Sequence, residues 1–463
     1  MAQRWPLPRH SVGDKHKVTP DPRLFPSPEG SPLLKTRSLQ HVLVMLACAG
    51  MPCAMASQTD TVTRTETAFD AWRMDEVSAL LPTLPDTAEG DYVRGLVANR
   101  MNDVEASKRF LSRALPALER QHSPRAVNAL LTLSDDYQKT SSYADQSAVL
   151  REAAKHHAKD IGPDAMRGVE DVIALSSALS GSPPQTVSFS GASRLPIRRN
   201  PLGTLDVDAV ANGIGGSWML DSGANYSVVS ESFAKRLGLS VKGTAGGIGS
   251  STGASVQSKV AIVKEIHLGS ATLHNVAVLV VADDQLHIKL PNKEHQITAA
   301  FGFPVFQALG RIRFHGDTAI SIGPAPIPLD GGVPIYMDGL TPVVLGFTVG
   351  ERVPLVLDTG ASSTSLSSAY WMKVKDGANS WPRSQQPSAG LGGAQRFDVV
   401  TQPEWKLILG TDETTLKNVR IETVSRSGPG GPPMFGTVGQ DAWANAAGFT
   451  VDFQSMRFRI DRN

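Results

Sequence analysis

The chain carries Trp218-Met219-Leu220-Asp221-Ser222-Gly223-Ala224 and, further on, Leu355-Val356-Leu357-Asp358-Thr359-Gly360-Ala361. Each stretch runs from an apolar, strand-like segment into Asp-Ser/Thr-Gly-Ala. One such tripeptide is common, because Asp, Ser and Gly all favour the turn that follows a strand. Two copies in similar surroundings favour a chain that brings two carboxylates together. Two ordinary strand-to-turn junctions are the alternative interpretation.

The spacing around the two motifs favours a true internal repeat. Asp221 and Asp358 lie 137 positions apart, and the same offset relates Val229-Ser230 to Leu366-Ser367 and Phe301-Gly302 to Val438-Gly439. Between these points an offset of 143 relates Gly247-Ile248-Gly249 to Gly390-Leu391-Gly392, and Leu273, Asn275 and Val276 to Leu416, Asn418 and Val419. Duplicated β-rich units diverge in this way, because loops gain and lose residues while strands hold their positions.

The paired motifs resemble those of the retropepsin-like and pepsin-like aspartic peptidases, over about residues 200 to 463. In that family each lobe carries Asp-Thr/Ser-Gly-Ala and, later, two apolar residues followed by Gly. The resemblance implies a single chain with two lobes, nearer in length to a fused retropepsin pair than to pepsin. It also implies that Asp221 and Asp358 are catalytic, and that Ser222, Gly223, Thr359 and Gly360 support the active-site loops. Gly302 and Gly439 then have a structural role, and so does Asp441, whose counterpart is Pro304.

The chemistry of such a pair follows from electrostatics. Two adjacent carboxyls cannot both ionise easily, so near neutral or mildly acidic pH they share one proton. The ionised member can take a proton from water while the protonated member polarises a peptide carbonyl. We therefore expect no metal and no cofactor. A degenerate peptidase that binds peptide without cutting it is an alternative. The presence of both Asp221 and Asp358 argues against it.

Two glycine-rich segments fall where the family carries a flap that closes over the substrate. They contain the candidate flap residues Gly247, Ile248 and Gly249, and Gly390, Leu391 and Gly392. Glycine suits a mobile tip, although a plain hairpin turn is also consistent with the pattern. Neither segment has the tyrosine of pepsin flaps, so which lobe covers the substrate stays open.

The sequence lacks the patterns of a metal site, a serine nucleophile and a nucleic-acid-binding surface. The histidines of the first lobe lack the spacing of a metal site. No G-x-S-x-G motif is present. The net charge of +1 gives no sign of nucleic-acid binding. Arg194, Arg198 and Arg199 are expected to form solvated surface.

The region before residue 180 differs in kind. From about Glu66 to Leu179 it is rich in Ala, Leu, Arg and Glu with helical periodicity. Residues 92–114 look like a tetratricopeptide-type helix pair, and a weaker copy follows at an offset of 39; an unspecific helical bundle is the alternative. Such a module could bind a protein partner or the substrate chain, brace the protease, or be removed as a pro-segment.

The N-terminus indicates export. A basic, Pro-rich leader precedes the apolar run 41–49, and Ala54-Met55-Ala56 supplies a small-x-small cleavage signal. The run is short for a membrane span, so we expect a signal peptide, no stable span and a periplasmic or secreted protein. The long leader also raises the question of the true start codon. Cys48 and Cys53, the only cysteines, fall inside this signal. Residues 1–56 hold seven Lys/Arg and three Asp/Glu, which leaves 38 and 41 in the rest.

The sequence thus predicts a multidomain chain, with an all-α helical-repeat module followed by a mainly-β, two-lobed acid-protease fold. The expected divisions are 1–56 leader and signal, 60–180 helical, 181–200 linker, 201–322 lobe 1, 323–340 linker and 341–463 lobe 2. We expect an exported aspartic endopeptidase acting on peptides or unfolded proteins. The alternative is an inactive peptide-binding or scaffold protein that uses the helical repeat and the cleft.

Overall fold

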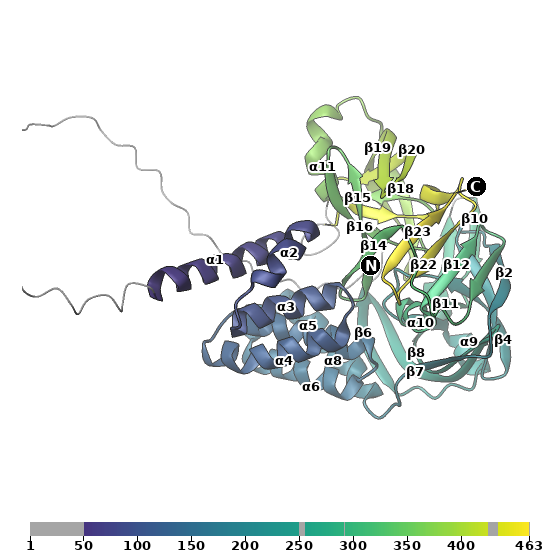
Figure 1. The fold of residues 1–463 in the computed structure, drawn as a ribbon. Helices are drawn as coiled ribbons and strands as arrows, with labels where there is room; N and C mark the ends of the chain where they lie inside the picture. Colours follow the sequence, from purple (N-terminus) through teal and green to yellow (C-terminus); the bar gives the residue numbers. More distant parts are fainter. Residues whose placement is uncertain (1–50, 250–254, 291, 425–433, 463) are drawn as a thin grey trace, which may run out of the picture.

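The structure, a computed structural model, describes residues 51–249, 255–290, 292–424 and 434–462. A helical region precedes a large, mainly-β region, so the predicted fold class is confirmed (Figure 1). No helix among the described residues is long and apolar enough to cross a membrane.

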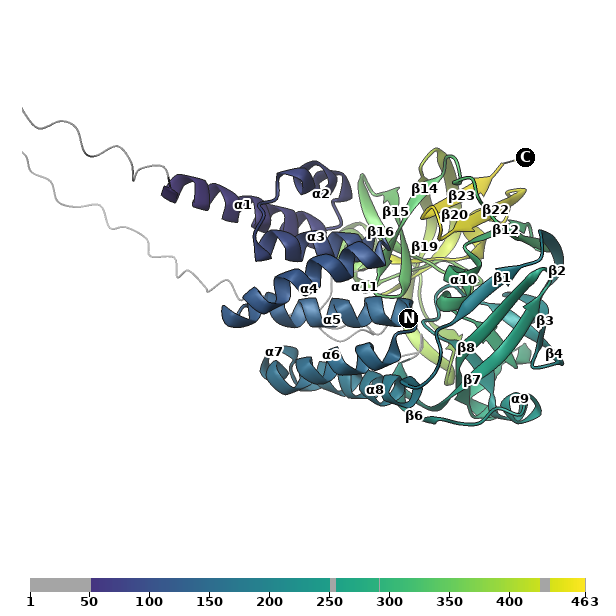
Figure 2. The same cartoon turned by 60° about the horizontal axis from the view of Figure 1, so that its bottom comes forward.

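The helical region consists of antiparallel helices stacked side by side (Figure 2). The helices are α1 (Met51–Asp70), α2 (Met74–Leu80), α3 (Ala88–Arg100), α4 (Val104–Arg120), α5 (Arg125–Lys139), α6 (Tyr143–His156), α7 (Ala158–Ile161) and α8 (Pro163–Leu179). Local signals set the starts: Thr87 accepts a hydrogen bond from the amide of Gly90, and Asp103 accepts one from the amide of Ala106. These side chains satisfy amides that have no partner within the helix.

The offset of 39 expected in this region has a structural counterpart. Asn102 and Ser141, at that spacing, both adopt positive φ immediately before the cap residues of α4 and α6. Leu111 and Leu150, one offset apart, are both fully buried. Two helix pairs with matched turns and matched core positions therefore follow one another. Their assignment to the tetratricopeptide class stays a prediction.

The β region divides into two halves of similar construction. The first half contains β1 (Thr186–Phe189), β2 (Ser193–Arg199), β3 (Leu205–Ala211), β4 (Ile214–Leu220), β5 (Ser227–Ser230), α9 (Glu231–Arg236), β6 (Gly243–Gly249), β7 (Ser255–Leu268), β8 (Ala271–Val281), β9 (His287–Leu290), β10 (Lys293–Gln296), β11 (Ala299–Phe301), α10 (Phe303–Leu309), β12 (Arg311–His315) and β13 (Ala319–Ile322). The second contains β14 (Val333–Asp338), β15 (Thr341–Thr348), β16 (Glu351–Leu357), β17 (Ser365–Leu366), α11 (Ser368–Val374), β18 (Arg383–Gly390), β19 (Gly393–Leu409), β20 (Asp412–Glu422), β21 (Gly436–Val438), β22 (Gly448–Asp452) and β23 (Arg457–Asp461).

Strand pairings in the first half recur 137 residues later in the second. Strand β4 runs parallel to β11, with Met219 opposite Ala300, and β16 runs parallel to β21, with Val356 opposite Thr437. The offset of 143 has its own counterpart: Asn275 and Asn418 both adopt positive φ, at points where the pairing of β8 with β7 and of β20 with β19 skips a residue. Asparagine tolerates this backbone conformation better than most residues.

One six-stranded antiparallel sheet joins the two halves, in the order β2, β13, β12, β22, β23, β14. Its central pairing joins β12 of the first half to β22 of the second, with Ile312 opposite Val451. A continuous hydrophobic core runs through both halves, and it includes Trp218, which stacks on Phe301 with ring centroids 4.4 Å apart.

Strands also lie in two ranges that were expected to be linkers. β1 and β2 fall within 181–200, and β14 falls within 323–340, although residues 323–332 contain neither helix nor strand. Along β2 inward and outward residues alternate, but only Leu195 and Ile197 are large apolar residues on the inner side, and Pro196 lies between them, so the sequence signal for a strand is weak. The sequence of β14 is apolar, as expected of a strand, but Gly331 and Gly332 directly before it favour a linker that continues through this range.

The helical region packs against both halves. Trp72 meets Tyr336 of β14 edge to face, with ring centroids 6.5 Å apart, and Arg352 of β16 donates to Asp75 at 2.6 Å. On the other side Leu175 and Leu179 of α8 share a buried cluster with Ala245 of β6. The helices therefore bridge the two β halves (Figures 1 and 2).

Candidate functional site

Asp221 and Asp358 each stand at the end of an interior strand, in two loops that face one another. Asp221 follows β4, and its amide donates to the carbonyl of Phe301 at 3.1 Å. Asp358 follows β16, and its amide donates to the carbonyl of Val438 at 3.2 Å. In each half one parallel strand, β11 beside β4 and β21 beside β16, extends the strand pairing up to the aspartate. Both carboxyls therefore project from rigid positions.

Ser222 and Thr359 cross-link the two loops. The amide of each residue donates to the hydroxyl oxygen of the other, at 3.0 and 3.1 Å. Each hydroxyl then donates across the interface, that of Ser222 to the carbonyl of Leu357 and that of Thr359 to the carbonyl of Leu220, both at 3.0 Å. Both side chains are fully buried. Four hydrogen bonds shielded from water thus fix the relative position of the two aspartates.

Gly223 and Gly360 allow the aspartates to approach the opposite loop. A Cβ on Gly223 would lie 2.6 Å from the carboxyl carbon of Asp358, and one on Gly360 would lie 2.5 Å from that of Asp221. Each glycine amide also donates to the aspartate two residues before it, at 3.0 Å for Asp221 and 2.7 Å for Asp358. Neither glycine has positive φ. Their role is therefore close approach rather than an unusual backbone conformation.

The two carboxyls act as one electrostatic unit. Desolvation by the surrounding protein raises the pKa of Asp221 to about 7, and the charge of Asp358 and the hydrogen bond between the two carboxyls add to the rise. The hydrogen bond from the Gly223 amide acts in the opposite direction. One proton held between two carboxyls is the arrangement that such proximity favours.

Gly302 and Gly439 lie beneath the loops that carry Asp221 and Asp358. A Cβ on Gly302 would come within 2.5 Å of the Tyr226 backbone, and one on Gly439 within 2.6 Å of the Ser363 backbone. The Gly302 amide donates to the Ser227 hydroxyl, and the Gly439 amide donates to the Thr364 hydroxyl, both at 3.1 Å. Close packing against main chain accounts for glycine at both positions.

The support beneath the loops is unequal. Asp441 accepts hydrogen bonds from the amide of Thr364 at 2.8 Å and from its hydroxyl at 2.6 Å. Pro304, at the equivalent position of the first half, offers no such group. A polar residue therefore stabilises the Asp358 loop without a counterpart beneath the Asp221 loop.

Gln440 is a supporting residue that the motif did not indicate. Its side-chain amide donates to the carbonyl of Thr359 at 2.8 Å, and its side-chain oxygen accepts from Arg199 at 2.7 Å. Arg199 is exposed, as expected of a solvated arginine, and it also links the first half to the loop of Asp358 through Gln440. No local sequence signal marks this pair, because 241 positions separate the two residues.

The candidate flap residues lie in two hairpins. Gly247, Ile248 and Gly249 end β6, which pairs with β7, and residues 250–254 lie outside the described residues. Leu391 and Gly392 form the turn between β18 and β19, with Gly390 opposite Gly393. The amide of Gly392 donates to the carbonyl of Gln285 at 3.0 Å, so this turn reaches the first half.

Helix α8 holds the first hairpin. The Asp171 side chain accepts a hydrogen bond from the Gly247 amide at 3.2 Å, and a Cβ on Gly246 would collide with that carboxylate. A Cβ on Gly243 would lie 2.8 Å from the Ala178 side chain. Glycine at these positions of β6 therefore permits contact with a helix, a role that the flap interpretation did not anticipate.

Among the described residues, no cluster of His, Cys, Asp and Glu has the arrangement of a metal site. The geometry at Asp221 and Asp358 consists of two carboxyls, four cross-linking hydrogen bonds and two glycines in close contact. Such a pair can hold a proton on one oxygen and accept one on another, as acid–base activation of water requires.

Comparison with known proteins bears on the first half of the site. A family model described as aspartyl protease matches residues 207–302. No curated protein matches the chain. The matched range begins in β3, contains Asp221, Ser222 and Gly223, and ends at Gly302. The similarity to aspartyl proteases supports an aspartic protease-like hydrolase, and it covers the first of the two Asp motifs.

Proposed function

We propose that the chain is an aspartic endopeptidase that hydrolyses peptide bonds with a water activated between Asp221 and Asp358. The hydrogen-bonded cross-link between Ser222 and Thr359 is the observation that carries the proposal, because it aligns two carboxyls from distant parts of the chain in one buried site. The similarity of residues 207–302 to aspartyl proteases agrees with it.

In this mechanism the two carboxyls have different starting states. Asp221, whose pKa is raised to about 7, holds the shared proton and donates it in a hydrogen bond to the substrate carbonyl. Asp358 acts as the base and takes a proton from the water, whose oxygen attacks the carbonyl carbon. Asp221 passes its proton to the former carbonyl oxygen, which gives a neutral tetrahedral diol.

Collapse of the diol completes the reaction. Asp358 gives the proton it took to the amide nitrogen, the C–N bond breaks, and a diol hydroxyl returns a proton to Asp221. The products are a carboxylic acid and an amine, and the dyad is restored. No covalent bond to the enzyme forms at any step.

Peptide would bind in an extended conformation across the junction of the two halves. Main-chain hydrogen bonds to the hairpins β6–β7 and β18–β19 would supply affinity, and pockets for alternate side chains would supply preference. The two hairpins serve as the flaps in this proposal.

The full chain incubated with carboxymethylated casein, across mildly acidic to neutral pH, tests the proposal. The unmutated chain should release peptides, whereas Asp221→Asn and Asp358→Asn should release none. Asp164→Asn is the matched control, because this exposed carboxylate on α8 lies outside the site. Equal release by all variants, or release by none, contradicts the assignment. Binding of casein without cleavage would favour the inactive peptide-binding alternative.

We also propose that the protein is exported, because the apolar run 41–49 and Ala54-Met55-Ala56 have the form of a signal peptide. N-terminal sequencing of the mature protein from a secreting bacterial host tests this. A mature chain that begins after Ala56 is the expected result, and an uncleaved chain retained in the cytoplasm contradicts it.

A further inference from the structure

The two halves of the β region repeat around the pair of aspartates, so equivalent residues on its two sides can be compared. Asn225 and Tyr226 lie four and five positions after Asp221, and Ser362 and Ser363 lie at the equivalent positions of the second half. A peptide in extended conformation that crosses the two carboxyls would leave the site past one of these pairs on each side. What covers each pair therefore decides how much chain can extend on that side.

The pair in the second half is open to solvent. Ser362 and Ser363 are both exposed. The turn 200–203 of the first half touches this loop, because a Cβ on Gly203 would lie 3.1 Å from the Cβ of Ser362. Pro201, in the same turn, is exposed as well. This end of the junction between the halves therefore faces solvent.

The pair in the first half lies against the helical region instead. The turn 337–340, equivalent to 200–203, touches α5, because a Cβ on Gly339 would lie 3.5 Å from the Asp135 carboxylate. Tyr226 packs against a buried cluster that includes Tyr143 of α6 and residues of α8. The hydroxyl oxygen of Tyr226 is shielded from solvent. Helices therefore cover the end of the junction whose counterpart is exposed.

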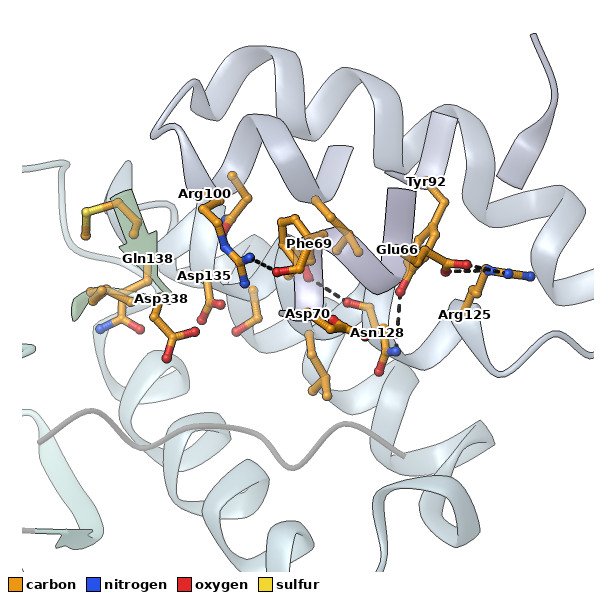
Figure 3. A pocket seen from close by; sticks show the side chains of 18 of the residues that line it. Glu66, Phe69, Asp70, Tyr92, Arg100, Arg125, Asn128, Asp135, Gln138 and Asp338 are labelled. Atoms are coloured by element: carbon orange, nitrogen blue, oxygen red, sulfur yellow. Dashed lines mark hydrogen bonds and ion pairs between the residues drawn. The ribbon is translucent and has the colours of Figure 1, made fainter. Parts of the chain in front are cut away.

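A cavity of about 520 Å³ lies between this end of the junction and the helices (Figure 3). Asn225, Tyr226 and the turn 337–340 line one side of it, and residues of α1, α3, α5 and α8 line the other. A cavity of this size holds a drug-sized ligand, so it has room for a few residues of peptide. Behind it the helices pack on one another through a buried core that includes Leu111 and Leu133. Close packing of this kind leaves no passage for a longer chain.

Contacts with both β halves hold this helical cover in place. Trp72 of the helical region and Val343 of β15, in the second half, belong to one buried cluster. On the other side Asp171 of α8 accepts a hydrogen bond from the amide of Gly247 in β6, at 3.2 Å. A buried apolar interface restricts the motion of one part of a chain relative to another. The cover is therefore a fixed part of the fold.

We propose that the helical region closes one end of the peptide-binding junction, so that the internal bonds cleaved lie within a few residues of a chain end. The inference rests on the proposed peptidase function. The cavity takes the short end of the substrate, and the long part leaves past Ser362 and Ser363. The substrates are therefore peptides and unfolded chains with a free end, rather than loops within folded proteins. The direction in which the peptide crosses the aspartates decides whether the N-terminus or the C-terminus enters the cavity.

Peptides that are extended at one end test the proposal with the unmutated full chain. Pools with a short randomised core carry a Gly-Ser extension of about 15 residues, about 50 Å when extended, at the N-terminus, at the C-terminus, at both or at neither. Extension at one terminus should lower kcat/KM for bonds in the core at least about tenfold, and extension at the other should leave it unchanged. The sensitive terminus is the one that enters the cavity. Core cleavage that survives extension at both ends, or that falls equally with either extension, overturns the proposal.

A crosslink tests whether the helical cover stays in place during catalysis. Asp75 of α2 and Arg352 of β16 form an exposed ion pair at 2.6 Å, so Asp75→Cys with Arg352→Cys can be joined by a short bismaleimide. Cys48→Ser and Cys53→Ser remove the only other cysteines. The crosslinked chain should keep the cleavage rate and the terminus preference of the same variant without crosslinker. Cleavage that is lost on crosslinking would show that the helices must move aside, which overturns a fixed cover.

The outcomes separate the two proposals. Cleavage within the core of doubly extended peptides refutes the closed end and leaves the peptidase standing. No cleavage of any pool refutes the peptidase, and the closed end with it.

Discussion

Gly360 lies directly against the carboxyl carbon of Asp221, although Asp221 precedes it by 139 positions in the chain. Gly223 lies in the same way against the carboxyl carbon of Asp358. Each aspartate is thus in close contact with the loop that carries the other aspartate. The two motifs are a single structural unit, in which the glycine of one half is required by the carboxylate of the opposite half.

Gly360→Ala should therefore damage the site of Asp221 more than its own loop. The added methyl would lie 2.5 Å from the Asp221 carboxyl carbon, so that carboxyl must move. We expect peptidase activity to fall at least about 100-fold, as a displacement of about 1 Å at a reacting group can cause. Gly215→Ala is the control, because nothing lies within 4 Å of a Cβ at that position. Equal activity of both variants would refute the close-contact role.

Thr359→Val should lower the free energy of unfolding through lost hydrogen bonds rather than lost packing. The change leaves the Ser222 amide and the Leu220 carbonyl without their partner in a buried site. Each such group costs about 1–3 kcal/mol, so we expect a loss of about 2 kcal/mol or more in urea unfolding. Thr359→Ser keeps the hydroxyl and should lose much less. Similar losses for both variants would indicate that the methyl group matters more.

Activity should fall as pH rises through about 7. The raised pKa of Asp221 means that its carboxyl is protonated below this value and loses its proton above it, so the acid of the mechanism disappears. The pH profile of kcat/KM on casein-derived peptides measures this. A profile that continues to rise above neutral pH would contradict a shared proton on the pair of carboxyls with a raised pKa.

The free energy of unfolding should also depend on pH through the carboxyl of Asp221. A carboxyl with a raised folded pKa favours the folded state fully below the unfolded value of about 3.9, and this contribution disappears as pH rises through about 7. Asp221→Asn should remove that part of the pH dependence. Urea unfolding of the two proteins at several pH values checks it. Identical pH dependence in both would contradict the shift.

Asp171→Ala should loosen the β6–β7 hairpin from outside the β region. It removes the acceptor of the Gly247 amide, which α8 supplies. We expect amide hydrogen exchange in β6 to accelerate by up to about tenfold, in line with a net hydrogen-bond contribution of about 1 kcal/mol. Glu170→Ala, an exposed neighbour on the same helix, is the control. Unchanged exchange in Asp171→Ala would show that the apolar contacts of α8 suffice.

The sequence predicted the parts of the site that are encoded locally. Strand, turn and glycine preferences are all visible around Asp221 and Asp358, and the offset of 137 recurs in the pairings of β4 and β16. Ser230 caps α9 and Ser367 caps α11, so both short helices that follow the motifs begin at a serine.

Features that depend on distant contacts were not predictable in this way. Gln440 and Arg199 carry no motif, and only the fold brings them together. The glycines of β6 were attributed to hairpin mobility, whereas the structure shows a helix packed against them. The sequence of β2 has only two apolar inward residues, Leu195 and Ile197, on either side of Pro196, and the pairing with β3 and β13 that completes the strand comes from distant parts of the chain.

The six-stranded sheet shared by the two halves has a consequence for biosynthesis. During translation β12 emerges from the ribosome together with β13, its partner on one side, and well before β22, its partner on the other side. Until β22 has emerged, one edge of β12 is unpaired and exposed. Completion of the shared sheet must wait until β22 has been synthesised. A chain truncated before β22 would therefore lack β22 and β23 of this sheet and be prone to aggregation.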